Sequence, residues 1–297
     1  MLSTKQWKCV LAAAFAGLSI VVSGCEFGGS DSGAADQAAA DATAPESMAQ
    51  TPAAGVEPAV PVIAERLPYA EVDNELVYGH FVFPADMVDP LPAVIMIHAS
   101  WGLDDQTRAQ ADSLAAEGYI VLAIDLFGGS TADAPEQARL QMVRVVENPE
   151  SARENIRQAY AFVSETAGAP RIGSLGWDFG GGWSLDAAML FPNELDAVVI
   201  VYGQVTDDED ALRPIDAPIL GLFGGRDPSI TLDVVRDFES ALERLRKNYD
   251  VHVYPYAGHA FADPAAATYD AGVAEDAWQR VLEFFDLHLR IDDAESS

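Results

Sequence analysis

The side chain best placed for chemistry is Asp178, at the centre of residues 176–182 (GWDFGGG). This segment follows the apolar run 172–175 and opens a helical pattern that continues to Leu190. Glycines on both sides permit a strained turn in which larger neighbouring side chains would clash. A turn of this kind between a strand and a helix presents its central side chain as a nucleophile. The group presented here is a carboxylate, neither a hydroxyl nor a thiol.

Two further side chains lie where they can complete a catalytic relay. Asp227 follows the apolar run 219–223 in a glycine-rich turn, and His259 follows the run 251–256. The order nucleophile, acid, histidine is that of α/β-hydrolases and differs from the order in other triad proteins. Because parallel strands end at the same edge of a sheet, we expect Asp178, Asp227 and His259 to be neighbours in space and to form the catalytic site.

The pocket around a nucleophile in this position needs backbone N–H donors for a developing oxyanion. In α/β-hydrolases one donor belongs to the residue after the nucleophile, and the other comes from the loop after the third strand. That loop is here residues 98–102, in which we expect His98 to position the loop rather than to take part in catalysis. The expected oxyanion and pocket residues are Phe179, Ser100, Trp101 and Trp177.

The elements that must hold these residues alternate between strand and helix. The predicted strands are an alternating segment and a series of short apolar runs, at 75–83, 93–97, 119–124, 172–175, 197–202, 219–223 and 251–256. The predicted helices are 105–117, 135–146, 151–166, 180–190, 232–246 and 274–289. This alternation predicts an α/β-hydrolase fold with a mostly parallel central sheet flanked by helices. Because the connection 203–216 is short, we expect no large cap domain.

Four motifs spread over the domain point to a particular family. They are residues 97–103 (IHASWGL), 123–129 (AIDLFGG), 176–183 (GWDFGGGW) and 258–261 (GHAF). Together they make residues 75–289 resemble the dienelactone hydrolase family. The resemblance implies catalysis by cysteine, aspartate and histidine, with a glutamate after the third strand that interacts with the cysteine. This sequence departs at both places, because Asp178 replaces the cysteine and Ala99 stands where the glutamate is expected.

The paired departure has two explanations. A glutamate beside Asp178 would force one of the two carboxyl groups to hold a proton, so its loss lets Asp178 stay ionised beside His259. Alternatively, the glutamate lost its purpose once the thiol was gone.

The arginines that bind a substrate carboxylate in well-known family members also have no evident counterparts after Phe127 and Phe261. We therefore do not expect a carboxylated dienelactone as substrate.

An aspartate changes the available chemistry. Attack on an ester carbonyl would give an anhydride and expel a far more basic alkoxide, so the adduct would collapse backward. A carboxylate does attack sp³ carbon, and His259 oriented by Asp227 can then activate water against the alkyl ester. Haloalkane dehalogenases and epoxide hydrolases, whose elbow resembles this one, work in this way but carry a cap. Trp101 and Trp177 are candidate donors to a leaving halide.

Two other functions remain open for the same residues. Asp178 can act as a general base toward water, which also makes the protein a hydrolase of a small molecule. The alternative is a catalytically degenerate, lipid-anchored module that binds a ligand or a partner. No cofactor and no metal are expected. The two cysteines, Cys9 and Cys25, both lie near the N-terminus, which leaves the domain without cysteine catalysis or a Cys-based metal site.

The N-terminus has the features of a bacterial lipoprotein. Lys5 and Lys8 precede an apolar run at 10–22 that is too short to span a membrane, and residues 22–25 (VSGC) resemble a lipobox. We expect a signal peptide at 1–24, lipidation of Cys25, a disordered acidic and Ala-rich tether at 25–61, the domain at 62–290 and a tail at 291–297. The expected location is the cell envelope outside the cytoplasm, at the outer membrane.

The net charge restricts the partners. The chain has 17 basic and 47 acidic residues and a formal charge of −30 at pH 7. A surface this acidic excludes nucleic acid as a partner and repels anionic lipid headgroups. Membrane association is therefore expected only through the N-terminal lipid. The excess of acid is typical of proteins from saline media, where salt screens self-repulsion, or of a generally soluble surface.

Overall fold

The computed structural model describes residues 60–290. The predicted signal peptide, the lipidation site Cys25, most of the tether and the tail 291–297 lie outside the described residues. No helix between residues 60 and 290 is long and apolar enough to cross a membrane.

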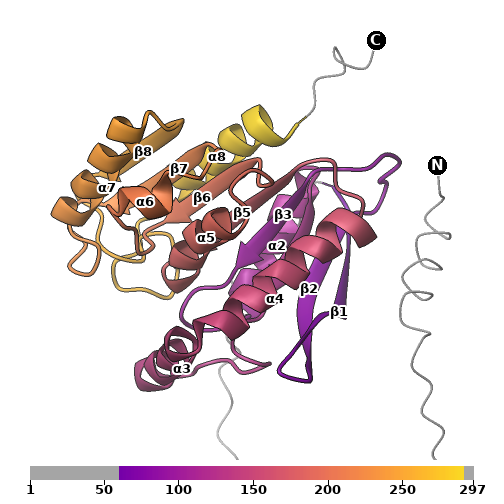
Figure 1. Ribbon diagram of the computed structural model, residues 1–297. Helices are drawn as coiled ribbons and strands as arrows, with labels where there is room; N and C mark the ends of the chain where they lie inside the picture. Colours follow the sequence, from indigo (N-terminus) through magenta and orange to yellow (C-terminus); the bar gives the residue numbers. More distant parts are fainter. Residues whose placement is uncertain (1–59, 291–297) are drawn as a thin grey trace, which may run out of the picture. The chain divides into compact units, whose positions relative to one another are not determined.

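An eight-stranded sheet with the order β1-β2-β4-β3-β5-β6-β7-β8 forms the centre of the domain (Figure 1). Its strands are β1 (Val62–Val72), β2 (Glu75–Pro84), β3 (Ala93–Ile97), β4 (Ile120–Ile124), β5 (Ile172–Trp177), β6 (Ala197–Val201), β7 (Ile219–Gly224) and β8 (Tyr249–Tyr254). The pairs β1–β2 and β2–β4 are antiparallel, and all the others are parallel. Every residue of β3 to β7 is buried, which explains their unbroken apolar character.

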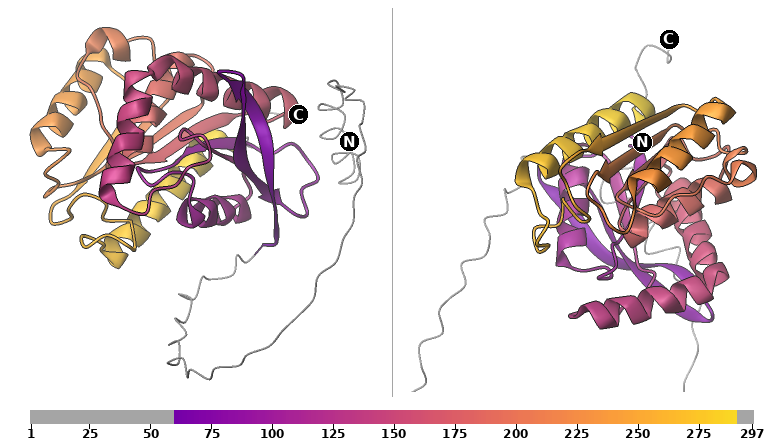
Figure 2. Two further views of the ribbon diagram at one scale, coloured as in Figure 1. Left: turned by 90° about the horizontal axis from the view of Figure 1, so that it is seen from below. Right: turned by 90° about the vertical axis from the view of Figure 1, so that its left-hand side faces the viewer.

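Helices cover both faces of this sheet. They are α2 (Asp105–Ala116), α3 (Pro135–Glu147), α4 (Pro149–Ala161), α5 (Phe179–Leu190), α6 (Glu209–Leu212), α7 (Leu232–Leu245) and α8 (Ala271–Leu289). Helices α2 and α8 lie on one face, and α4, α5 and α7 lie on the other (Figures 1 and 2). The predicted α/β-hydrolase fold is confirmed. Between β6 and β7 the chain forms only the short helix α6, so no domain inserted there covers the sheet edge.

Three details differ from the sequence prediction. Strand β1 was not predicted; it joins β2 through Asp73 and Asn74, whose φ angles of 53° and 63° suit a two-residue hairpin turn. The last strand runs over Tyr249–Tyr254 rather than 251–256, because Pro255 has no N–H to continue the ladder. The predicted helix 151–166 begins at Pro149 and ends in a π-helical turn, Phe162–Thr166.

Candidate active site

Asp178 lies in a strained turn between β5 and α5. Its φ and ψ angles are 51° and −118°, a conformation that non-glycine residues rarely adopt. Its N–H donates to the carbonyl of Val201 at 3.0 Å, which ties the turn to the neighbouring strand. A Cβ atom on Gly176 would lie 2.0 Å from the Gly180 carbonyl oxygen, and one on Gly180 would lie 2.2 Å from that of Ile97. The flanking glycines are therefore required by close backbone approach.

A hydrogen-bonded relay links the three residues expected to be neighbours. The Nε2 atom of His259 lies 3.1 Å from Oδ1 of Asp178, and Nδ1 lies 2.7 Å from Oδ2 of Asp227. The Asp227 carboxylate is fully buried and accepts N–H bonds from Ser229 at 2.7 Å and Ile230 at 3.0 Å. Two strand ends and the turn after β5 thus bring Asp178, His259 and Asp227 into one line of hydrogen bonds.

The second oxygen of Asp178 occupies the expected oxyanion position. The Ser100 N–H donates to Oδ2 at 3.3 Å, and the Phe179 N–H lies near enough to the carboxylate to help lower its pKa. Ser100 rather than Trp101 therefore supplies the loop donor. The expected oxyanion donors hold the enzyme's own carboxylate, which carries one more oxygen than a hydroxyl or thiol would.

A cavity of about 200 Å³ opens above this carboxylate. Trp101 and Trp177 line it as expected, and Tyr202, Asp104 and Asp263 line it as well. No lysine or arginine is among the residues that line it. The cavity therefore offers no arginine or lysine to a negatively charged substrate.

The family model described as "Dienelactone hydrolase family" matches residues 78–289. The chain belongs to the dienelactone hydrolase family.

The alignments of this dienelactone hydrolase family member with its relatives cover nearly the full length of those relatives. An Escherichia coli K12 protein named "Putative carboxymethylenebutenolidase" is 31% identical over 264 residues, covering 80% of this chain and 97% of that protein. A solved structure of "Putative Dienelactone Hydrolase" from Klebsiella pneumoniae is similar with a TM-score of 0.68 and 27% identity, over 77% of this chain and all of that one. The dienelactone hydrolase from Anabaena variabilis, at 24% identity and a TM-score of 0.59, covers 77% of this chain and 99% of its own and shares the fold.

The relay of this family member is charged at rest. The pKa of His259 is raised from 6.5 to about 9, chiefly because the imidazole is hydrogen-bonded to Asp178; burial opposes the shift and Asp227 adds to it. Burial acts to raise the pKa of the Asp178 carboxyl, but hydrogen bonds from His259, Ser100 and Phe179 outweigh it, and the pKa is lowered. At neutral pH the site therefore holds an imidazolium between two carboxylates.

This charge state predicts a pH dependence of stability. Because the pKa of His259 is higher in the folded protein, its contribution is complete below pH 6.5 and is lost as the pH rises toward about 9. The loss is expected to be about 2 to 3 kcal/mol in the free energy of unfolding, which urea titrations across that range will measure. An Asp178→Asn variant removes the largest cause of the shift and is expected to flatten the dependence. Equal losses in both proteins would contradict this account.

His98 positions the loop that carries Ser100. Its ring is fully buried, its Nδ1 donates to the Ala99 carbonyl at 2.7 Å, and its Nε2 accepts the Leu126 N–H at 3.0 Å. Burial lowers the pKa of this histidine, which agrees with a neutral ring that donates from one nitrogen and accepts at the other. The expected positioning role of His98 matches these contacts.

Tyr202 lines the catalytic cavity and Asp125 shapes a loop at the same sheet edge, but the sequence analysis assigned neither residue a role. The Asp125 carboxylate accepts the N–H groups of Phe127, at 2.7 Å, and Gly129, and so shapes the loop after β4. Tyr202 follows β6 with a φ of 39°, and its ring lies edge-on to His259 with centroids 5.4 Å apart. Their positions in the sequence could have indicated a role, because both residues come directly after a buried strand, at the sheet edge where Asp178 and Asp227 lie.

Proposed function

We propose that this protein is a hydrolase in which the Asp178 carboxylate attacks an sp³ carbon. The observation that carries the proposal is that the two carboxylate oxygens of Asp178 make different contacts. Oδ2 accepts the Ser100 N–H, while Oδ1 lies beside His259 in a cavity, with the side chain 25% exposed. A carboxylate oriented in this way is a nucleophile that stays ionised, with a histidine in place for a second step.

The first step displaces a leaving group. A lone pair of the carboxylate forms a bond to the substrate carbon, the bond from that carbon to the leaving group breaks, and the leaving group departs with its electron pair. The product is an alkyl ester on Asp178. An ester carbonyl as target is unfavourable, because the carboxylate is a much better leaving group than the alkoxide it would have to expel.

Ester formation prepares His259 for the second step. The charge and hydrogen bond of Asp178 are the strongest factors that raise the pKa of His259, and both are weakened when the carboxylate becomes a neutral ester. The imidazolium can then release its proton to solvent, to which its side chain is partly exposed, and act as a general base toward water, with Asp227 fixing its orientation.

The second step returns the enzyme to its starting state. Water loses a proton to His259 and attacks the carbonyl carbon of the ester, and negative charge develops on the oxygen that accepts the Ser100 N–H. This donor already points at that oxygen in the resting site, so it stabilises the tetrahedral intermediate without reorganisation, and the Phe179 N–H is proposed as the second donor. Collapse of the intermediate breaks the bond between the acyl carbon and the alkyl oxygen, and this oxygen takes the proton from His259 and leaves as the alcohol. The carboxyl group left on Asp178 then gives its proton to His259, which restores the carboxylate and the imidazolium.

The charges around the cavity limit the range of possible substrates. Asp104, Asp178 and Asp263 line it together with His259, and no arginine or lysine does. The imidazolium of His259 is already paired with Asp178 and Asp227. An anionic substrate such as a carboxylated dienelactone would therefore find no unpaired countercharge and be repelled by the carboxylates. The proposed substrate is therefore a small uncharged electrophile, which differs from what the names of the curated relatives suggest.

Isotope labelling tests the covalent route. In water enriched in ¹⁸O, with enzyme in excess over 1-bromobutane or 1,2-epoxyhexane, a single turnover is expected to yield an alcohol without the label. The heavy oxygen is expected in Asp178 instead, visible as a mass shift of one peptide. Label in the alcohol and none in the protein would show that Asp178 acts as a general base. Neither product nor label with either compound would favour the ligand-binding alternative.

We also propose that the mature protein is anchored to the bacterial envelope through a lipid on Cys25. The support is the apolar run 10–22 followed by residues 22–25 (VSGC). A Cys25→Ser variant is expected to leave the membrane fraction or to remain unprocessed, as shown by fractionation and immunoblotting. Unchanged membrane fractionation of that variant would overturn the anchor.

A further inference from the structure

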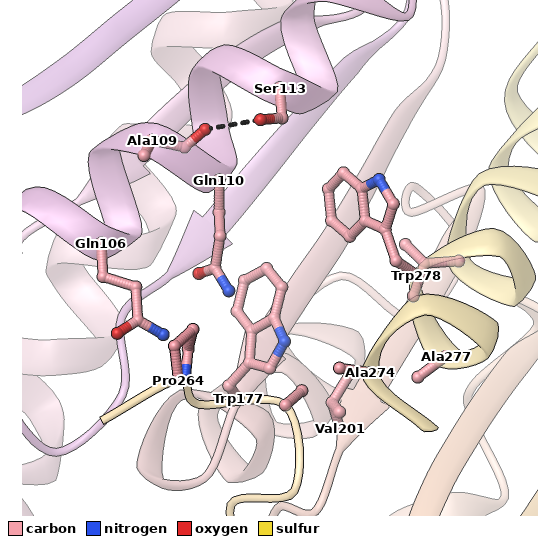
Figure 3. Close-up of a pocket in the computed structure, with 12 residues that line it drawn as sticks. Gln106, Ala109, Gln110, Ser113, Trp177, Val201, Pro264, Ala274, Ala277 and Trp278 are labelled. Atoms are coloured by element: carbon pink, nitrogen blue, oxygen red, sulfur yellow. Dashed lines mark hydrogen bonds between the residues drawn. The ribbon is translucent and has the colours of Figure 1, made fainter. Parts of the chain in front are cut away.

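A second cavity of about 290 Å³ adjoins the catalytic one and shares with it Trp177, Gln106 and Gln110. We call it the annex. Figure 3 shows Gln106 and Gln110 reaching from α2 toward Trp177, with Trp278, Ala274 and Ala277 of α8 on the other side. Because Trp177 directly precedes Asp178, the annex begins at the catalytic turn.

The lining of the annex is suited to an apolar group. On α8 it consists of Ala274, Ala277, Trp278 and Val281, which recur at helical spacing on one face. The two alanines leave room between the indoles of Trp177 and Trp278. No charged side chain is among the lining residues, although the protein as a whole is strongly acidic.

We infer that the annex holds the apolar arm of an uncharged substrate whose reacting carbon lies at Asp178. The three lining residues shared with the catalytic cavity favour a substrate arm over a separate ligand. The inference rests on the proposed function for the position of the reacting carbon, whereas the apolar binding itself requires no reaction. Each methylene that enters the annex is expected to tighten binding about threefold to fourfold.

Chain-length dependence of binding tests the annex. The probes are the 1-bromoalkanes from bromoethane to 1-bromohexane, titrated into the Asp178→Asn variant, which cannot be alkylated. Bromine close to Trp177 and Trp278 quenches their fluorescence, so the signal reports occupancy of the annex. Dissociation constants are expected to fall steadily with chain length.

Substitutions on α8 test whether the dependence of binding on chain length arises in the annex. With Asp178→Asn as background, Ala274→Leu fills the annex and is expected to weaken 1-bromohexane binding at least tenfold while leaving bromoethane nearly unchanged. Ala271→Leu makes the same change at an exposed position on the same helix and is expected to have no effect. Trp278→Ala, which removes an indole wall without adding volume, is a second variant expected to weaken binding of the long chain.

The outcomes separate the annex from the catalytic proposal. Binding that does not depend on chain length, or that Ala274→Leu and Trp278→Ala leave unchanged in folded protein, would overturn the inference. Chain-length-dependent binding with no ester formed on Asp178 of the unmodified enzyme would support the annex and remove the covalent mechanism.

Discussion

Replacing His259 with glutamine is expected to leave the first chemical step intact and to block the second, so that an alkyl ester accumulates on Asp178. Attack by the carboxylate needs no proton transfer to the imidazole, whereas hydrolysis of the ester needs a base for water. Loss of that base is expected to slow turnover by a hundredfold to ten-thousandfold. Intact-protein mass spectrometry after incubation with 1-bromobutane will measure the adduct, and peptide mapping will place it.

A matched control separates this effect from a general loss of histidine. His252→Gln changes a half-buried histidine on β8 that does not line the catalytic cavity, and it is expected to turn over normally without an adduct. If His259→Gln carried no adduct while the unmodified enzyme still formed alcohol, the ester intermediate would be excluded.

Replacing Asp178 with asparagine is expected to abolish both the adduct and the alcohol. An amide is not a nucleophile toward sp³ carbon, and it cannot take a proton from water. The turn itself is expected to persist, because its N–H bond to Val201 and the contacts of Gly176 and Gly180 involve only backbone. Initial rates and far-ultraviolet circular dichroism will measure activity and fold, and the mass will confirm that the amide has not hydrolysed.

Asp263→Asn provides the control for the second substitution. This residue contributes another carboxylate to the same cavity, but its carboxylate accepts the Ala265 N–H and makes no hydrogen bond to His259. Activity is expected to survive this change. Full activity in Asp178→Asn would mean that neither nucleophilic nor general-base chemistry occurs at this carboxylate.

The strands that position the site could be predicted because they are buried on both faces. Unbroken apolar runs such as β3 have few alternative explanations, and the turn that follows each of them presents its polar residue at one edge. Edge strand β1 escaped prediction because Pro68 and a register shift between Pro68 and Ala70 interrupt its pattern. The pairing of β1 with β2 depends on positive φ angles at Asp73 and Asn74, and this residue pair alone does not specify those angles.

The finer features of the site depend on distances that no local pattern encodes. The sequence indicated Ser100 and Phe179 as oxyanion donors, but it could not show that Asp178 itself would accept the Ser100 N–H. The annex is built from α2, β5, β6 and α8, so its volume exists only after these elements pack. Helical spacing predicted α8, yet it did not indicate that Ala274 and Ala277 would line a cavity.

The filled oxyanion site has a practical consequence for detection. Reagents used to profile hydrolases across a proteome, such as fluorophosphonates and iodoacetamide, label an activated serine or cysteine. Here the nucleophilic position carries a carboxylate, its backbone donors are already engaged, and the described domain contains no cysteine. Surveys based on those reagents would pass over this protein even in cells where it is abundant. Detection would instead require electrophiles that react with a carboxylate, such as alkyl halides that carry a reporter group.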